Sequence, residues 1–326
     1  MATEKLEALV DRVAASTPED LKDRYRGVLL GVAAGNALGL PVEGRSRRAV
    51  ERAYPGGVRE VDVAERDRPW DDDLAQTVIV AEALLEERFT TGDLAARFVE
   101  WGRSNGRGMG HLTSEVLHEL GRGTPPPDAA RAVYERMGGT SSAGNGAVMR
   151  CAPVALRWRK SGASLIDAAR ASALVTHYDP LCEWSTVVMA VCVAIALAGQ
   201  DVSHDELADA VDASEAPSEV GEAIRFVPGR GLRDLELDDP MDMGYTLNAM
   251  QVGLWSFTKA LDFADTLVQV VDEGGDTDSN GAVAGAIMGA RVGASRIPPH
   301  WLANVPDTDR LTELADGLYA RGNSAA

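Results

Sequence analysis

The chain has 326 residues, of which 45% are hydrophobic and 25% are charged, as in ordinary folded globular proteins. Its 50 acidic and 32 basic residues give a net charge of −18. That charge argues against nucleic acid as a partner, because such binding depends on basic side chains that displace counterions from phosphates. Most of the acidic excess is interpreted as a contribution to solubility.

Helical spacing of apolar residues recurs along the chain. The first helix is indicated by apolar residues at positions i, i+3, i+4 and i+7, namely Leu6, Leu9, Val10 and Val13. Residues 17–20 (TPED) resemble a capping box with proline at the first helical position, and they predict a helix through Val32. The acidic first turn of residues 72–87 predicts another helix.

The remaining pattern is also helical. Further helices are expected over residues 94–101, 114–120, 129–137, 165–175, 183–198, 205–211, 247–257, 260–271, 280–292 and 309–319. Alternation suited to a strand is limited to residues 58–63 (VREVDV). No repeat is visible, and the breaker-rich stretches are short enough to be loops. We therefore expect one all-α domain over residues 1–326, with a core at about 20–320.

The three cysteines, Cys151, Cys182 and Cys192, show no CxxC spacing, and the N-terminus is acidic and amphipathic rather than a signal sequence. These features predict reduced thiols in a cytoplasmic protein. The longest apolar run, residues 187–198, suits a buried helix and is too short to span a bilayer. We expect no membrane contact.

Two acidic clusters are the strongest candidates for chemistry. Asp71, Asp72 and Asp73 are consecutive and repel one another, and a helix N-terminus relieves only about 0.3–1 kcal/mol per charge. Residues 274–280 (GGDTDSN) alternate acids with hydroxyls between two glycines and an apolar helix. Each cluster alone is also compatible with an acidic helix cap.

Together the clusters offer only oxygen ligands: Asp71, Asp72, Asp73, Asp276, Asp278 and the hydroxyl of Ser279. Such hard donors favour Mg²⁺, Mn²⁺ or Ca²⁺ over zinc. The spacing does not match an EF-hand loop, since no glutamate follows at the twelfth position. Roughly six ligands can hold two adjacent ions that orient a hydrolytic water.

Two glycine-rich segments, 142–150 (SAGNGAVMR) and 106–113 (GRGMGHLT), lead into apolar or helical stretches. Exposed backbone N–H groups at such points can cradle a phosphate, although a turn without a ligand is equally compatible with them. His177, in the segment THYD, could donate to a ligand or cap a helix. Glu43, judged by composition alone, is a solvated carboxylate.

In this order the motifs resemble those of the ADP-ribosylglycohydrolase family, over residues 25–319. The matching segments are GNALG (35–39) followed by Glu43, DDDL (71–74), GNGAVMR (144–150), THYD (176–179) and GGDTDSN (274–280). The chain departs from the family pattern at four positions: Asn36 replaces an aspartate, Asp71 and Leu74 replace threonines, and Ala143 replaces an aromatic residue found in some relatives.

The resemblance implies a compact, orthogonally packed all-α fold, usually monomeric, with two Mg²⁺ or Mn²⁺ ions. It implies hydrolysis of the glycosidic bond between ADP-ribose and an acceptor, either a protein side chain such as arginine or a small molecule. The implied ion ligands are the six residues Asp71, Asp72, Asp73, Asp276, Asp278 and Ser279.

The resemblance also assigns roles around the ions. The diphosphate would be held by Ser142, Gly144 and Asn145 together with Gly106, Gly108 and Gly110. His177 would lie near the ribose or a phosphate. Glu43 would activate water or adjust the ion site, so that Glu43, Asp72 and Asp276 form the catalytic set.

Three alternatives stay open from the sequence. The chain could hydrolyse another ribosyl or nucleotide-like glycoside. It could bind ADP-ribose without turnover, a possibility that Asn36 and Leu74 motivate. It could also be a structural protein whose acidic clusters only cap helices.

Overall fold

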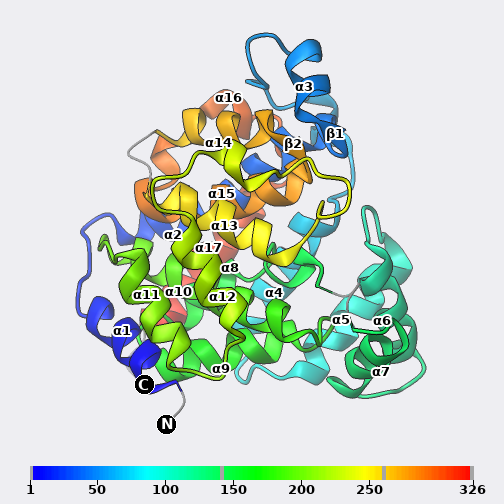
Figure 1. Ribbon diagram of the computed structural model, residues 1–326, viewed down its shortest axis with the longest axis vertical. Coiled ribbons are helices and arrows are strands. Elements are labelled where there is room, and N and C mark those ends of the chain that lie inside the picture. The colour runs from blue at the N-terminus through cyan, green and yellow to red at the C-terminus, as the bar shows by residue number, and fades with distance from the viewer. Residues whose placement is uncertain (1–2, 140–142, 259–261, 324–326) are drawn as a thin grey trace.

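A computed structural model describes residues 3–139, 143–258 and 262–323. The fold is all-α, as the sequence predicts (Figure 1). The helices are α1 Glu4–Ala14, α2 Leu21–Gly39, α3 Arg47–Ala53, α4 Asp72–Leu85, α5 Thr91–Ser104, α6 His111–Gly121, α7 Asp128–Arg136, α8 Ala152–Trp158, α9 Gly162–Ala173, α10 Pro180–Leu197, α11 His204–Asp212, α12 Ser218–Phe226, α13 Thr246–Thr258, α14 Phe263–Asp272, α15 Thr277–Val292, α16 Pro299–Leu302 and α17 Thr308–Asn323.

Short 3₁₀ turns and one small pairing of strands connect the helices. The turns are η1 Leu40–Val42, η2 Val63–Asp67, η3 Asn145–Ala147, η4 Leu232–Leu235 and η5 Ala294–Arg296. Strands β1 Arg45–Ser46 and β2 Gly274–Gly275 pair antiparallel, with Arg45 opposite Gly275. In Figure 1, α3 and β1 project at the top, α5, α6 and α7 group at the lower right, and α2 and α15 run through the middle.

Helices α2 and α15 pack antiparallel through glycines spaced four residues apart. A Cβ atom added to Gly31 would lie 2.2 Å from the carbonyl oxygen of Gly285, and one added to Gly35 would lie 1.9 Å from that of Gly281. The same contact pairs Gly27 with Gly289. Only glycine lets the two backbones approach so closely. This contact aligns the C-terminal end of α2 with the N-terminal end of α15.

Helix α10 is buried on all sides, because its residues Cys182 to Leu197 all lie in the core. By length and composition it could cross a membrane, but 89% of that stretch is buried inside the protein. A helix that is hydrophobic all round is expected at the centre of a large all-α core. The prediction of a buried helix for residues 187–198 is therefore confirmed. The cysteines 151, 182 and 192 are buried and form no disulfide bond.

Two local predictions are wrong. Residues 58–63 form no strand; instead the N–H of Val58 donates to Asp272, and the carbonyls of Arg59 and Val61 accept from Trp301 and Asn304 side chains. Residues 17–20 form no capping box, because α2 begins at Leu21 without a side-chain cap. In both places tertiary contacts and turns satisfy the backbone groups that the local pattern assigned to regular structure.

Helix boundaries otherwise lie close to the predictions, and most helices extend a few residues beyond the apolar pattern. The sequence does not predict helices α3, α8, α12 and α16; of these, α3, α8 and α16 offer at most two turns of periodicity. The predicted helix 260–271 corresponds to α14, and its first two positions, 260 and 261, lie outside the described residues.

Candidate active site

The close packing of α2 against α15 brings the two acidic clusters to one place. The hydroxyl of Thr277, at the first position of α15, donates a 2.9 Å hydrogen bond to the carbonyl oxygen of Gly39, at the end of α2. The N–H of Gly44 donates a 2.9 Å bond to the carbonyl of Gly275, next to the β1–β2 pair. Together these bonds place Glu43 beside the first turn of α15.

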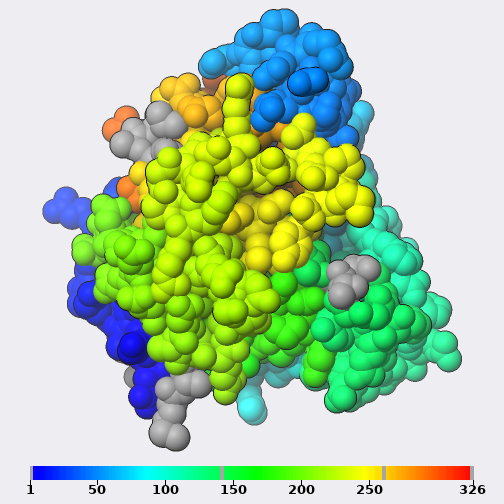
Figure 2. All heavy atoms as spheres, in the orientation of Figure 1, coloured from blue at the N-terminus to red at the C-terminus, as the bar shows by residue number. Residues whose placement is uncertain are grey.

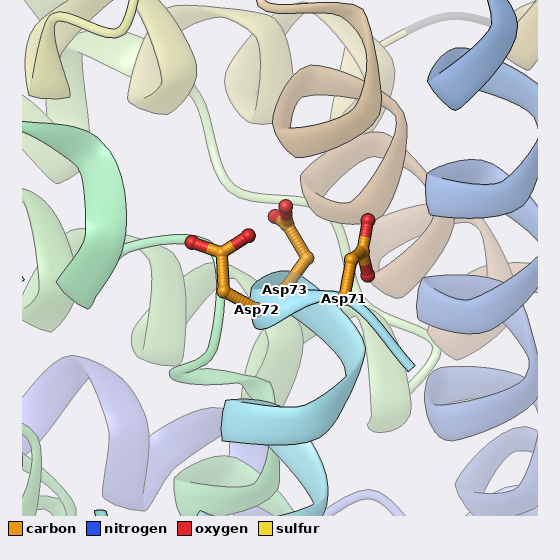
Figure 3. A group of neighbouring side chains, drawn as sticks. All are labelled: Asp71, Asp72 and Asp73. Atoms are coloured by element: carbon orange, nitrogen blue, oxygen red, sulfur yellow. The ribbon is translucent and has the colours of Figure 1, made fainter. Parts of the chain in front are cut away.

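The first cluster lies at the start of α4. Figure 3 shows Asp71, Asp72 and Asp73 diverging from this first turn, with Asp71 on the side of the blue helix α2. One carboxylate oxygen from each of the three lies within 4.8 Å of the others. Asp71 and Asp73 are buried, and Asp72 is partly exposed. The predicted proximity within this cluster is therefore present in the fold.

The second cluster lies at the start of α15 and meets the first. The hydroxyl of Ser279 donates to Oδ2 of Asp73 over 3.3 Å. The side chain of Asn145, in η3, donates a 2.8 Å hydrogen bond from Nδ2 to Oδ2 of Asp276. Asp278 is buried beside them. Three segments that are far apart in the sequence thus share one acidic centre.

The carboxylates do not serve as ordinary helix caps. Asp71 and Asp276 occupy the N-cap positions of α4 and α15, but neither accepts a capping hydrogen bond of ordinary geometry. Oδ1 of Asp71, of Asp73 and of Asp278 is buried without a hydrogen-bond partner among the described residues. Buried anionic oxygens left unpaired are costly, so this arrangement fits a cation better than a structural cap.

Burial and mutual repulsion shift the titration of these groups. Burial, followed by the charges of Asp71 and Asp276, raises the pKa of Asp72 from 3.8 to about 7. Burial and then the neighbouring carboxylate charges raise the pKa values of Asp73 and Asp278 well above the ordinary value. A nearby positive charge would reverse both effects, because it favours the ionised form.

Glu43 lies at the solvent-exposed rim of this centre. Its carboxyl group is nevertheless partly surrounded by protein, and this desolvation raises its pKa, with the charges of Asp276 and Asp71 adding to the effect. The charge of Arg107 acts in the opposite direction. Sequence composition described Glu43 only as a solvated carboxylate, whereas the fold puts it next to both acidic clusters.

A cavity of about 340 Å³ opens beside the acidic centre. Among the predicted substrate-binding residues, those that line it are Gly108, Gly110, Gly144, Asn145 and His177. Gly106 does not line it; its N–H bonds to the carbonyl of Trp101 in the turn after α5. Ser142 lies outside the described residues. Glu43, Asp72, Asp73, Asp276, Asp278 and Ser279 complete the acidic side of the lining.

The loop before α13 contributes lining residues that the sequence did not single out. Met243 and Gly244 line the cavity, and the carbonyl of Gly244 accepts a 2.9 Å bond from the N–H of Asn145. Figure 2 shows this yellow segment on the surface between the blue segment at the top and the green segments below it. No sequence motif marks this segment, so its place at the cavity is decided by the fold.

A second cavity, of about 280 Å³, adjoins the first and shares Glu43, Gly108 and Asp278 with it. It is lined by the carboxylates of Glu43, Asp62, Glu65, Asp71 and Asp278 and by the guanidinium groups of Arg68 and Arg107. Both guanidinium groups are already paired with the buried carboxylate of Glu65, at 2.6 Å and 3.1 Å. The remaining charge that faces this cavity is negative.

Fold and site together define an all-α protein whose carboxylates meet at two helix N-termini beside a glycine-lined cavity. The chain belongs to the ADP-ribosylglycohydrolase family, whose model matches residues 17–326. Like the named members, it is therefore a glycosidic-bond hydrolase. The family resemblance seen in the motifs is confirmed.

Individual relatives agree with this assignment over nearly the whole chain. ADP-ribosylarginine hydrolase Tri1 of Pseudomonas putida is 28% identical, over 96% of this chain and 82% of the relative. The ADP-ribosyl-[dinitrogen reductase] glycohydrolase of Rhodospirillum rubrum is 28% identical, over 89% of this chain and 92% of the relative. A solved structure described as an ADP-ribosylglycohydrolase-related protein complex has a TM-score of 0.74 at 28% identity, covering 94% of this chain and all of that one.

Proposed function

We propose that this chain is a divalent-cation-dependent hydrolase that releases ADP-ribose from the side chain of arginine. The metal dependence rests on one oxygen each of Asp71, Asp73 and Asp278, which is buried and has no hydrogen-bond partner within the part of the chain that the structure describes. The predicted ligands are all oxygen donors, which suits Mg²⁺ or Mn²⁺. The six predicted ligands, Asp71, Asp72, Asp73, Asp276, Asp278 and Ser279, would hold two such ions.

Bound divalent cations would orient the hydrolytic water and lower its pKa, which makes the water a better nucleophile. The protein groups have separate tasks. Glu43, at the rim shared by the two cavities, would accept a proton from the attacking water and return it to the departing guanidine. Asn145 holds the Asp276 carboxylate through its 2.8 Å hydrogen bond. The side chains of Asp72 and Asp276 face the same cavity.

The larger cavity would take the ADP-ribose part of the substrate. Its glycines at 108, 110 and 144 expose backbone to a ligand, which suits close approach to a diphosphate. His177 lies on the same wall and offers a ring nitrogen. These residues are the ones that the family resemblance assigns to the diphosphate and ribose.

The second cavity favours a cationic acceptor. Besides the proposed ion ligands Asp71 and Asp278, its lining carries the carboxylates of Glu43 and Asp62, and its two guanidinium groups are already paired with Glu65. Since an excess of negative charge attracts a cation, a guanidinium leaving group fits this cavity better than a neutral hydroxyl. The Pseudomonas putida relative, named an ADP-ribosylarginine hydrolase, supports the same acceptor.

The test is hydrolysis of arginine-linked and serine-linked ADP-ribose with Mg²⁺, with Mn²⁺ and with excess chelator. We expect release from arginine that stops in chelator. Asp276→Ala and Asp278→Ala should each abolish turnover and lower metal occupancy, whereas Asp167→Ala, an exposed acid on α9, should do neither. Full activity in chelator would refute the metal role.

The same assay separates the alternatives. Preferred release from serine would contradict the proposed acceptor and leave the hydrolase assignment in place. Tight calorimetric binding of ADP-ribose without any hydrolysis would indicate the non-catalytic binding protein. Hydrolysis restricted to another ribosyl glycoside would show that the substrate is not an ADP-ribose derivative.

A further inference from the structure

A buried guanidinium group lies behind the wall of the larger cavity. Arg150 is fully enclosed, and its Nη1 donates a 2.5 Å hydrogen bond to Oε1 of Gln76. Its Nη2 donates to Oγ1 of Thr176 at 2.5 Å and to the carbonyl of Ser172 at 3.5 Å. The guanidinium carbon lies 4.5 Å from the centre of the Phe98 ring. These contacts fix the guanidinium in one orientation.

Thr176 connects this cation to the histidine of the cavity wall. Its Oγ1 lies 2.7 Å from Nδ1 of His177. The arginine can only donate, so it uses one lone pair of the Thr176 hydroxyl. Thr176 is fully buried, and among its described contacts only Nδ1 of His177 can accept the hydroxyl hydrogen. The arrangement that satisfies every group therefore has Thr176 donating to Nδ1.

The ring of His177 carries one hydrogen. Burial, followed by the charge of Arg150, lowers the pKa of His177 to about 3, so the ring is neutral. With Nδ1 acting as acceptor, the hydrogen lies on Nε2. That atom faces the glycine segment of the cavity, because a Cβ added to Gly146 would lie 3.0 Å from it and one added to Gly144 would lie 3.7 Å from it.

We propose that Arg150 and Thr176 are positioning residues that lock His177 in its Nε2–H tautomer, so that the neutral ring donates one hydrogen bond to an oxygen of bound ADP-ribose. The identity of this ligand rests on the proposed function, whereas the tautomer does not. The chain of contacts runs from the buried cation through a hydroxyl to the cavity wall. A ring free to switch tautomers would present an acceptor to the same oxygen in part of the molecules.

The tautomer is measured directly by ¹⁵N NMR of the ring nitrogens of the full-length protein at neutral pH. Loss of one set of signals in His177→Gln assigns the ring among the five histidines. We expect Nε2 protonated and Nδ1 unprotonated in the wild type and in Thr176→Ser. Thr176→Val, which removes the hydroxyl, should give a mixed or reversed tautomer. A wild-type ring protonated at Nδ1 would overturn the proposal even if every variant failed to fold.

Binding provides the second readout, with ADP-ribose and Mg²⁺ in a calorimeter. Thr176→Val should weaken the binding of ADP-ribose by about tenfold, which is the effect of one hydrogen bond to an anionic group. Thr176→Ser should restore the affinity to within about threefold of the wild type. Thr266→Val is the matched control, because the hydroxyl of Thr266 is buried in α14 and donates to the carbonyl of Asp262, far from the cavity lining. It should bind as the wild type does.

The outcomes keep the two proposals apart. Unchanged binding and an unchanged tautomer in Thr176→Val would contradict the positioning role. No binding of ADP-ribose to the wild type would contradict the proposed function, while the wild-type spectrum would still decide the tautomer.

Discussion

Asn36 donates a 2.9 Å hydrogen bond from Nδ2 to Oδ2 of Asp71, a buried contact between α2 and the start of α4. The other oxygen of Asp71 stays unpaired among the described residues. The family pattern has an aspartate at position 36 and a threonine at position 71. In this chain the carboxylate therefore lies at the start of α4 and the neutral partner lies on α2. The pair keeps one negative charge and one neutral partner.

Substitution at this pair tests that exchange. Asn36→Asp replaces the donor with a second carboxylate and should destabilise the protein by about 3 kcal/mol or more, because a buried charge loses its partner. Adding Asp71→Thr should recover most of that loss, since one carboxylate and one neutral donor are restored. Urea unfolding of both single variants and the double variant gives the coupling energy. Additive losses would contradict the pairing.

The acidic centre should make the metal-free protein less stable as the pH rises. The pKa of Asp72 is raised to about 7 in the fold, whereas an unfolded aspartate keeps a value near 3.8. Between these values the folded chain binds more protons than the unfolded chain, so stability falls from about pH 4 to about pH 7. The full loss is on the order of 4 kcal/mol for Asp72. Urea unfolding in excess chelator measures it.

Divalent cations should reverse this trend. A ligand at a hundred times its dissociation constant stabilises the folded state by about 2.7 kcal/mol, so Mg²⁺ should raise stability most at neutral pH. Asp72→Asn should flatten the pH dependence in chelator and make the metal-free protein more stable at neutral pH. If the free energy of unfolding in chelator stays constant or increases over this pH range, the ionised carboxylates do not destabilise the metal-free fold, and the prediction is wrong.

The contact between α2 and α15 predicts a strong effect of a single methyl group. Gly31→Ala would place its Cβ 2.2 Å from the carbonyl oxygen of Gly285, and the two helices would have to separate. We expect a loss of about 3 kcal/mol, at the upper end for overpacking. Gly92→Ala, in α5, meets no atom within 4 Å and should be neutral or stabilising by up to about 1 kcal/mol. Equal unfolding midpoints for the two variants would refute the close contact.

The absence of a side chain at Gly108 is predicted to leave the room that the Asp72 carboxylate needs. Its φ of 78° is left-handed, and an added Cβ would lie 2.4 Å from Oδ1 of Asp72. Gly108→Ala should displace that carboxylate and weaken Mg²⁺ binding by about tenfold, a change of about 1.4 kcal/mol. Gly123→Ala is the control, because Gly123 has a φ of 97° but no atom within 4 Å of an added Cβ. It should show backbone strain without loss of Mg²⁺ affinity in a metal titration.

The local sequence predicts a helix correctly where the helix spans several turns and is amphipathic. The spacing of Leu6 and Val13 predicted α1 because the same face packs on the core. The strand prediction for residues 58–63 is wrong because alternating apolar and polar residues are also compatible with a loop whose backbone groups bond to side chains. The Trp301 and Asn304 side chains that accomplish this come from the far end of the chain, where no local pattern could indicate them.

The sequence by itself determined the helical class, the acidic and glycine-rich segments, and through them the family. Tertiary structure alone decided that Asp73 meets Ser279, that Asn36 partners Asp71, and that Arg150 stands behind His177. The reason is physical: periodicity and capping are properties of neighbours along the chain, whereas hydrogen-bond partners and burial depend on which helices pack together. Here the glycine contact of α2 with α15 makes that choice.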